Sequence, residues 1–170
     1  MLRKLCPQIY VTSVAALTPE YLSGKGIKGV IFDLDNTILP WKAKNLAPEE
    51  VSFLQRLQDS GLKICVVSNA FDRRVRSLLD PLSIPAISRA RKPRRTPFRQ
   101  ALEIMGTVPG ETAVVGDQIF TDVLGGNRLG LYTVLVAPVS RREFIGTKMV
   151  RLLEKRILKS MAKRGLLQKE

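Results

Sequence analysis

Residues 30–41 read VIFDLDNTILPW, an apolar run that ends in two aspartates one residue apart. The run belongs to the first of five predicted strands, at residues 29–33, 62–67, 84–87, 112–116 and 131–136. Segments with helical periodicity separate these strands, at residues 46–61, 73–80, 96–106 and 121–130. Continuous apolar strands that alternate with helices predict an α/β fold, in which helices cover both faces of a central parallel sheet.

Polar side chains follow the predicted strands at the points where they end. Asp33 and Asp35 end the first strand, Ser68 and Asn69 follow the second, and Asp117 follows the fourth. The loop after the third strand contains Lys92. Because open α/β sheets bind ligands beyond the carboxyl ends of their strands, we expect these side chains to share one rim of the sheet.

The residue types at this rim restrict the chemistry. The chain contains no histidine, which excludes Ser-His-Asp and Cys-His catalysis and most zinc sites. A carboxylate cluster without histidine is typical of a hard cation such as Mg²⁺, and Ser68 and Lys92 are donors suited to a phosphoryl group. A lone aspartate pair is more often a solvated turn, but four pieces in order at four strand ends predict phosphoryl transfer.

Four short motifs resemble those of the haloacid dehalogenase (HAD) superfamily of phosphatases: DLDNT at 33–37, SN at 68–69, KP at 92–93 and GDQIFTD at 116–122. The longer stretches GIKGVIFDLDNTILPW, RARKP and GDQIFTDVLGGNRLGLYTVLV resemble the YqeG-type branch of subfamily IIIA, which belongs with the phosphatidylglycerophosphate (PGP) phosphatase family. The resemblance covers nearly the whole chain. It implies a Rossmann-like three-layer sandwich and a phosphatase activity.

The resemblance also implies roles for the three aspartates of the first and last motifs. Asp33 is expected to be the nucleophile that forms an aspartyl-phosphate, and Asp35 the general acid and then the general base. Mg²⁺ is expected to bind the side chains of Asp33 and Asp117 and the backbone carbonyl of Asp35.

The other motif residues are expected to bind phosphate or to support the site. The phosphoryl oxygens are expected to contact Ser68, Lys92 and the backbone amides near Asn36 and Asn69, and Thr37 is expected to support the first-motif loop. Two interpretations of Asp122 stay open. It orients Lys92 or a metal-bound water, or it is an acid at the favourable N-terminal end of a helix.

The connections between the motifs are too short for a cap domain, the insertion that encloses small substrates in most relatives. An open site suits a large substrate, such as a protein, a nucleic acid end or a lipid headgroup. Trp41, which follows the first motif, is expected either to contact the substrate or interface or to be a partly buried surface aromatic.

The net charge of +13 predicts an anionic partner. Residues 89–99 carry six basic residues and no acid, and residues 141–170 carry ten against three glutamates. In the second segment an apolar stripe recurs at helical spacing: Ile145, Met149, Leu152, Leu153, Ile157 and Met161. Basic residues fall mostly off the stripe: Lys148, Arg151, Lys155, Lys159 and Lys163. This basic amphipathic helix either lies on an anionic membrane or packs on the domain with a solvated basic face.

We expect a single domain over residues 1–170, with a core at about 18–140 and the C-terminal helix at about 141–165. Neither a transmembrane run nor a signal-like N-terminus is evident, and Cys6 and Cys65 do not suggest a disulfide framework. The chain is therefore expected to be cytoplasmic, either fully soluble or peripheral on the inner membrane surface.

Three functions remain open from the sequence. The first is a Mg²⁺-dependent PGP phosphatase that produces phosphatidylglycerol. Its substrate, an anionic phospholipid, is implied by the family resemblance. The second is a soluble phosphatase of the same mechanism that acts on a small-molecule or protein phosphate ester. The third is a non-enzymatic nucleic-acid or ribosome-binding protein. It is less favoured, because no paired aromatic platform for RNA is evident and the acid set is intact.

Overall fold

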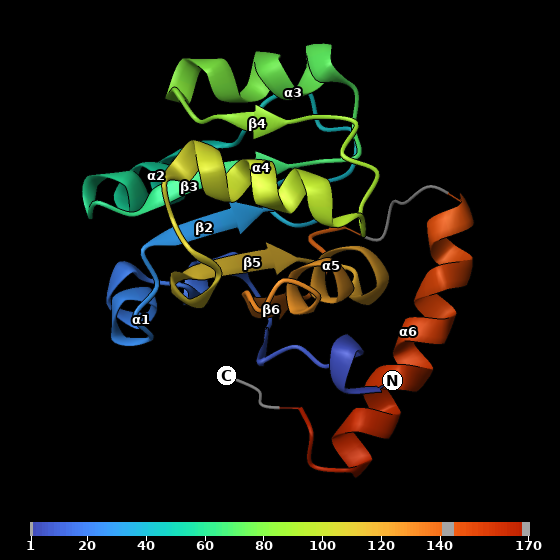
Figure 1. The fold of residues 1–170 in the computed structure, drawn as a ribbon. Coiled ribbons are helices and arrows are strands. Elements are labelled where there is room, and N and C mark those ends of the chain that lie inside the picture. Colours follow the sequence, from blue (N-terminus) through green and yellow to red (C-terminus); the bar gives the residue numbers. More distant parts are fainter. Residues whose placement is uncertain (1, 141–144, 168–170) are drawn as a thin grey trace.

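A computed structural model describes residues 2–140 and 145–167, without the side chains of residues 2, 3 and 145–148. Its six strands form one sheet in the order β1-β6-β5-β2-β3-β4, and every neighbouring pair is parallel. The strands are β1 (Ile9–Val11), β2 (Gly29–Phe32), β3 (Lys63–Val67), β4 (Ala86–Ile87), β5 (Thr112–Gly116) and β6 (Tyr132–Val136). The parallel α/β sheet predicted from the apolar runs is thus confirmed (Figure 1).

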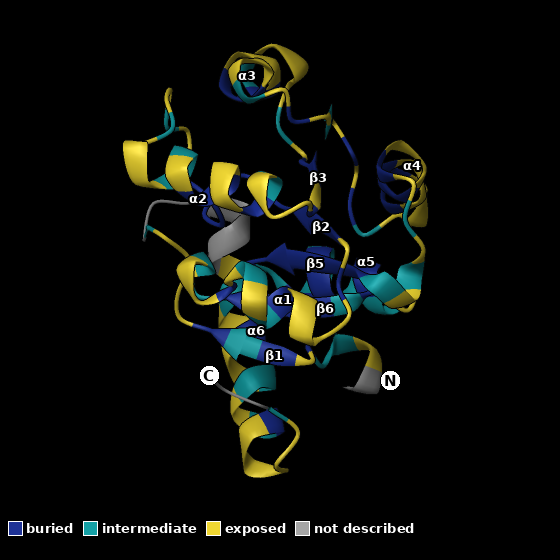
Figure 2. Cartoon of the chain, turned by 90° about the vertical axis from the view of Figure 1, so that its left-hand side faces the viewer, coloured by how far each residue is buried: buried dark blue, intermediate teal, exposed yellow. Residues whose placement is uncertain are grey.

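Helices cover both faces of the sheet (Figure 2). One face carries α1 (Pro19–Gly24), α2 (Pro48–Asp59) and α3 (Asp72–Leu79), whose apolar side chains pack with Val30 and Phe32 of β2. The other face carries α4 (Arg95–Met105), which packs on Ile31, and α5 (Leu124–Asn127). Consecutive strand residues point to opposite faces, so each strand is buried on both sides and reads as a continuous apolar run.

No cap domain interrupts the described chain between the motifs. Residues 38–67 contain only α2 and β3 as regular elements, apart from the isolated bridge between Asp35 and Leu39. Residues 70–91 contain only α3, a 3₁₀ turn (Asp80–Leu82) and β4. The carboxyl ends of the strands therefore remain open on the side that the motifs occupy.

The C-terminal helix α6 (Ile145–Lys163) runs beside the carboxyl ends of β2 and β5 (Figure 1). Ile157 and Leu158 pack against a small cluster of Ile119, Val123 and Leu135, and Met161 is fully buried. Met149, Leu152 and Leu153, from the same predicted stripe, are instead more than half exposed, at 74%, 64% and 51%. Residues 141–144 of the predicted helix and the side chains of Ile145 and Lys148 lie outside the described residues.

Among the described residues, no helix has the length and apolar character needed to cross a bilayer.

Candidate active site

Four neighbouring strands bring the motif residues together. Asp33 follows β2, and its N–H donates to the carbonyl of Val115 on β5 at 2.8 Å, as if the strand continued for one residue. Ser68 follows β3, Asp117 follows β5, and Lys92 lies in the loop after β4. Asp33, Asn36, Thr37, Ser68, Lys92, Asp117 and Asp122 are all buried. The predicted rim therefore exists at the carboxyl ends of β5, β2, β3 and β4.

Lys92 is held between two carboxylates. Its Nζ donates to Oδ1 of Asp33 and to Oδ1 of Asp122, both at 2.6 Å, and only 3% of its side chain is exposed. Asp122 comes from a π-helical turn, η5 (Ile119–Val123), and its Oδ2 also accepts from the backbone N–H of Gln118. This direct contact supports the first interpretation of Asp122, in which it orients Lys92.

Gly116 makes room for this arrangement. A Cβ built on Gly116 would lie 2.2 Å from Cγ of Asp122, much closer than non-bonded atoms approach. Any side chain at this position would displace the Asp122 carboxylate from Lys92. The glycine that begins the last motif is therefore required by close packing rather than by a turn.

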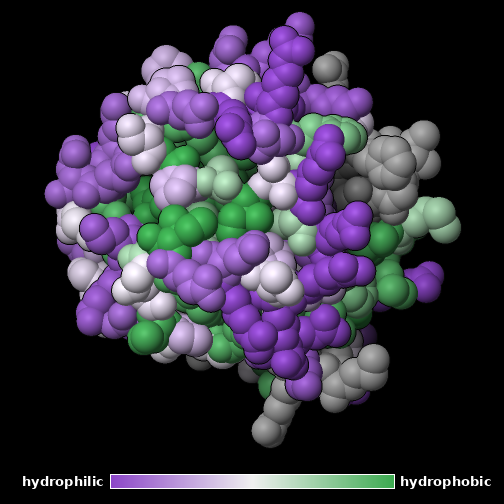
Figure 3. Space-filling model, turned by 45° about the horizontal axis from the view of Figure 1, so that its top comes forward, coloured by the Kyte–Doolittle hydropathy of each residue, from purple (hydrophilic) through white to green (hydrophobic). Residues whose placement is uncertain are grey.

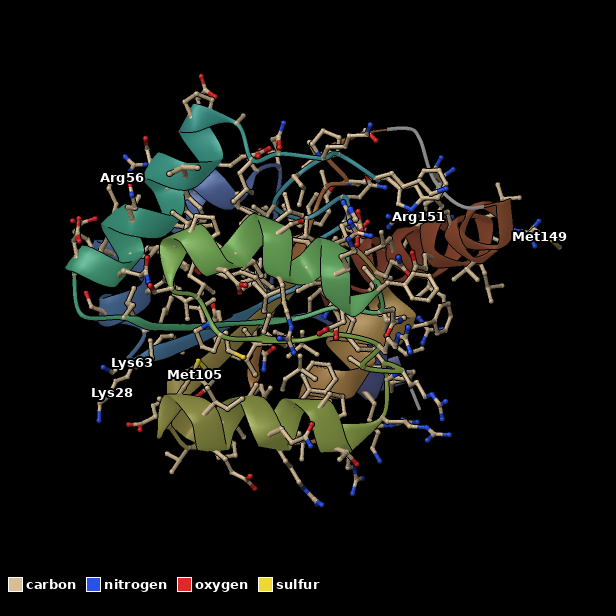
Figure 4. The ribbon with its side chains drawn as sticks, turned by 90° about the horizontal axis from the view of Figure 1, so that it is seen from above. Lys28, Arg56, Lys63, Met105, Met149 and Arg151 are labelled. Atoms are coloured by element: carbon tan, nitrogen blue, oxygen red, sulfur yellow. The ribbon has the colours of Figure 1, made fainter. Side chains whose placement is uncertain are left out.

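Asp117 is bound from both sides of the site. Thr37 Oγ1 lies 3.3 Å from Oδ2 of Asp33 and 3.4 Å from Oδ1 of Asp117, so its single proton can be donated to either carboxylate. Arg151 of α6 donates to Oδ2 and to the backbone carbonyl of Asp117. Arg151 points toward the sheet, whereas Met149 points away from the domain (Figure 4). The basic residue that the sequence pattern places off the apolar stripe thus reaches the active site.

Glu154 joins α6 to the same region. Its Oε1 accepts from the N–H groups of Ile119 and Phe120 at 2.7 and 3.2 Å, and its Oε2 lies 3.4 Å from Nη1 of Arg151. These N–H groups belong to the first turn of η5 and have no partner within a helix, so the buried Glu154 carboxylate satisfies them. No sequence motif marks Glu154, because its contacts depend on how α6 packs.

The buried carboxylates have perturbed proton affinities. Burial raises the pKa of Asp117 to about 8, with a further contribution from the Asp33 charge. Burial also raises the pKa of Asp122 to about 6, although the Lys92 ammonium opposes the shift. Burial alone would lower the pKa of Lys92, but the Asp122 and Asp33 carboxylates outweigh it and raise the pKa above its usual range. The cluster of Asp33, Lys92, Asp117 and Asp122 thus favours the binding of a proton or of another cation.

A divalent cation fits this set of donors. Asp33, Asp117 and Asp122 each offer a carboxylate oxygen, and these oxygens lie within 4.8 Å of one another. Three buried oxygen donors without histidine or cysteine suit a hard cation. The Asp35 carboxylate does not belong to this group of three. The metal contact predicted for Asp35 uses its backbone carbonyl, and the group consists of side-chain carboxylates alone.

The Asp35 carboxylate instead pairs with Arg74 on α3. Nη1 and Nη2 of Arg74 donate to Oδ2 and Oδ1 of Asp35, both at 2.8 Å. The N–H of Lys42 donates to Oδ1 of Asp35 at 3.1 Å. No sequence motif marks Arg74, since nothing in a short helix predicts which of its arginines faces the first motif.

The predicted phosphate-binding residues occupy the same rim. Ser68 Oγ accepts from the N–H of Ala70 at 3.1 Å, and Oδ1 of Asn69 accepts from the N–H of Lys92 at 2.9 Å. The N–H of Asn36 donates to the carbonyl of Leu39, while its side-chain oxygen accepts from the N–H of Trp41 and from Ser140. Asn36 thus holds the first-motif loop together. Its backbone N–H, which was expected near the phosphoryl oxygens, is bonded to Leu39 within that loop.

These residues line an open pocket of about 500 Å³. Its wall comprises Asp33, Asp35, Asn36, Trp41, Lys42, Ser68, Asn69, Ala70, Phe71, Arg74, Lys92, Gln118 and Thr121. A second hollow of about 550 Å³ lies at the amino ends of the strands, beside Lys28, Lys63 and Met105, far from the motifs (Figure 4). Asp33, Asp35, Ser68 and Lys92 all line the first pocket.

Family models match two parts of the chain. Residues 2–76 match the model described as mitochondrial PGP phosphatase, and residues 89–142 match the model described as HAD-hydrolase-like. Together they contain all four motifs.

Curated relatives extend the match over the full chain. A protein of Bacillus subtilis named probable phosphatase YqeG is 39% identical over 171 residues, which cover 100% of this chain and 99% of the relative. An Arabidopsis thaliana protein named phosphatidylglycerophosphate phosphatase 1, chloroplastic/mitochondrial, is 34% identical over 94% of this chain and 49% of its own length.

Solved structures share the fold. The cobalt-bound deoxy-D-mannose-octulosonate 8-phosphate phosphatase of Haemophilus influenzae matches with a TM-score of 0.56 and 18% identity, over 82% of this chain and 91% of that one. A HAD superfamily subfamily IIIA hydrolase of Legionella pneumophila matches with a TM-score of 0.53 and 20% identity, over 86% and 91% of the two chains. With its four motifs assembled at one rim, and a relative 39% identical along its full length, this chain belongs to the YqeG-type family of HAD phosphatases.

Proposed function

We propose that this phosphatase removes the terminal phosphate of PGP through an aspartyl-phosphate intermediate. A carboxylate oxygen of Asp33 attacks phosphorus, and the bond between phosphorus and the leaving oxygen breaks. Asp35 donates its proton to that oxygen, so the alcohol leaves neutral. A water then attacks the aspartyl-phosphate, gives its proton to Asp35 and releases inorganic phosphate, which restores Asp33.

The surrounding side chains prepare Asp33 for this reaction. Lys92 lies 2.6 Å from Asp33, where its ammonium offsets the charge of an approaching phosphoryl group. Ser68 and Asn69 line the same pocket and offer donors to the phosphoryl oxygens. Asp122 keeps Lys92 in place, and Thr37 fixes the spacing between Asp33 and Asp117.

We propose Mg²⁺ as the metal. Asp33, Asp117 and Asp122 would hold it, directly or through water, together with the Asp35 backbone carbonyl that the family resemblance implies. When bound, Mg²⁺ supplies Lewis-acid stabilisation of the phosphoryl oxygens.

The pocket and α6 support a lipid substrate. The pocket is open, and its wall contains two aromatic side chains, Trp41 and Phe71, the second 70% exposed. Met149, Leu152 and Leu153 of α6 are exposed apolar residues, and Lys155, Arg156 and Lys159 on the same helix are exposed basic residues. Hydrophobic atoms at the right-hand edge of Figure 3, where α6 lies, adjoin hydrophilic ones. Such a surface suits peripheral binding to an anionic membrane.

The observation that carries the proposal is the buried Asp33–Lys92–Asp122 cluster beneath this open pocket. The test is phosphate release with Mg²⁺ from PGP in mixed vesicles and from a panel of water-soluble phosphate esters, for the wild type and Asp33→Asn. We expect Asp33-dependent turnover that strongly favours the lipid. Turnover confined to soluble esters would retain the mechanism and replace the substrate. Equal activity in purified Asp33→Asn would contradict the mechanism itself.

A further inference from the structure

Arg74 belongs to none of the four sequence motifs, yet it holds Asp35 at the pocket wall. Its guanidinium contacts both carboxylate oxygens of Asp35 at 2.8 Å. Nε and Nη2 also donate to the carbonyl of Ala43, at 3.3 and 3.1 Å. The pair is therefore bidentate and anchored to the loop that follows the first motif.

This pairing engages both oxygens of Asp35, one of which the proposed step needs at the leaving group. To protonate the leaving group, an oxygen of Asp35 must carry a proton and contact the leaving oxygen. In the structure one oxygen accepts from Nη1 of Arg74, and the other accepts from Nη2 of Arg74 and from the N–H of Lys42. The guanidinium must therefore release Asp35 before an Asp35 oxygen can move to the leaving oxygen.

The distribution of charge in the pocket indicates which kind of group could compete with Asp35 for Arg74. Lys92 is buried and already paired with two carboxylates. Arg74, by contrast, has 24% of its side chain exposed and lines the pocket, as does the exposed Lys42. A substrate that enters with a second anionic group would thus meet Arg74 and Lys42, and the planar fork of a guanidinium fits a phosphate group as well as a carboxylate.

We propose that Arg74 is a positioning residue that exchanges Asp35 for a second phosphate group on the substrate. The enzyme then favours phosphomonoesters that also carry a phosphodiester. Once Arg74 pairs with the phosphodiester, the Asp35 carboxyl group is released and can turn to the leaving oxygen. A monoester without a second anion leaves Arg74 on Asp35. The inference rests on the proposed function and specifies how its acid is controlled.

The test compares two water-soluble substrates with the same kind of leaving group. Glycerol phosphate carries only the monoester, whereas glycerophosphoglycerophosphate, the deacylated headgroup of PGP, adds a phosphodiester. For the wild type we expect kcat/KM to favour the second substrate by about tenfold to hundredfold, the range of a charge-assisted hydrogen bond. For Arg74→Gln we expect the ratio to fall to about threefold or less, because the phosphodiester loses its partner and Asp35 no longer has to be released for glycerol phosphate.

Matched variants separate positioning from folding. Arg73→Gln alters the neighbouring arginine of α3, which is exposed and does not line the pocket, and should keep the wild-type ratio. Arg74→Lys keeps a cation without the fork and should give an intermediate ratio. Because both substrates are measured on the same preparation, the ratio does not depend on the fraction of folded protein.

The results divide clearly. A wild-type ratio near one, a ratio unchanged in Arg74→Gln, or an equal loss on both substrates in that variant would each overturn the role of Arg74. Any of these together with Asp33-dependent turnover would leave the phosphatase mechanism standing. Absence of Asp33-dependent turnover on both soluble substrates and on PGP vesicles would instead remove the proposed function, and the role of Arg74 with it.

Discussion

At the scale of single residues, the site is a balance of buried charges. The ammonium of Lys92 lies between Asp33 and Asp122, and a guanidinium lies beside Asp117. Charges taken out of water are stable only when each has a partner with good geometry. The ion pairs with Lys92 and Arg151 therefore allow the carboxylates of Asp33, Asp117 and Asp122 to lie close together.

Replacement of Lys92 tests this balance. We expect Lys92→Met to abolish turnover and to lower the free energy of unfolding by about 3–5 kcal/mol, since two buried carboxylates would lose their cation. Urea denaturation and phosphate release would measure the two effects. Lys63→Met removes an exposed lysine at the far end of the sheet and should change neither quantity by much (Figure 4). A stable Lys92→Met protein would show that the cluster does not need the ammonium.

The raised pKa of Asp117 predicts a pH-dependent response to metal. Its pKa rises from 3.8 to about 8 on folding, so between these values the folded protein binds more protons than the unfolded chain. The metal-free protein therefore loses stability as pH rises through this window. Because a bound cation replaces the proton, Mg²⁺ should raise Tm more at about pH 8 than at about pH 5.5. Calorimetry would measure this, and Asp117→Asn should reduce the pH dependence, leaving the smaller part that Asp122 contributes at lower pH.

Motif residues and their partners differ in how far sequence predicts them. Asp33, Ser68, Lys92 and Asp117 are predictable, because strand ends in a parallel sheet converge whatever the details of packing. Arg74 and Arg151 are not, because each reaches the site from a helix whose orientation depends on tertiary contacts. The alternation of charge along a helix does not distinguish an arginine at the active site from one in solvent.

At the scale of elements, α6 contacts the candidate active site as well as packing on the domain. Ile157 and Met161 anchor its C-terminal half, and Glu154 binds the first N–H groups of η5. The same geometry places Arg151 on Asp117. The two interpretations of this helix that the sequence leaves open are therefore not exclusive, because one half packs while the other exposes apolar residues.

Arg151 should compete with the cation for Asp117. We expect Arg151→Gln to bind Mg²⁺ about tenfold more tightly, equal to about 1.4 kcal/mol, because a nearby positive charge is removed. Isothermal titration calorimetry on the folded protein would measure this affinity without any substrate. Arg156→Gln, an exposed arginine of the same helix, is the matched control. Weaker binding in Arg151→Gln would mean that the guanidinium instead supports the metal ligands.

The sheet itself was largely predictable from sequence, with one omission. The five predicted strands are present, within two residues at each end. β1 was not predicted, because Ile9, Tyr10 and Val11 are only three residues between Gln8 and Thr12. It forms because β6 offers a free edge, where Ile9 pairs with Val134. Such a strand depends on a partner distant in sequence, which a local pattern does not contain.

At the scale of the whole molecule, the exposed apolar residues of α6 should govern membrane binding. We expect the double variant Met149→Glu, Leu152→Glu to bind anionic vesicles at least about tenfold more weakly, because inserting the two exposed apolar side chains into the membrane contributes roughly 3–6 kcal/mol and each glutamate is repelled by the anionic surface. Co-sedimentation would measure binding, with Ile104→Glu on α4 as the control. Turnover of soluble esters should not change. Equal binding by the double variant would place the contact elsewhere.

The beginning and end of the described chain also touch. Sγ of Cys6 donates to the carbonyl of Leu166 at 2.9 Å, and Asn127 donates to the carbonyls of Lys4 and Cys6. Residues 6 and 166 are thus in contact, so the two segments could be joined without moving the strands that form the pocket. A circular permutant that joins these segments and opens at the exposed Gly61, at the opposite end of the sheet, would present the same side chains to the same phosphate.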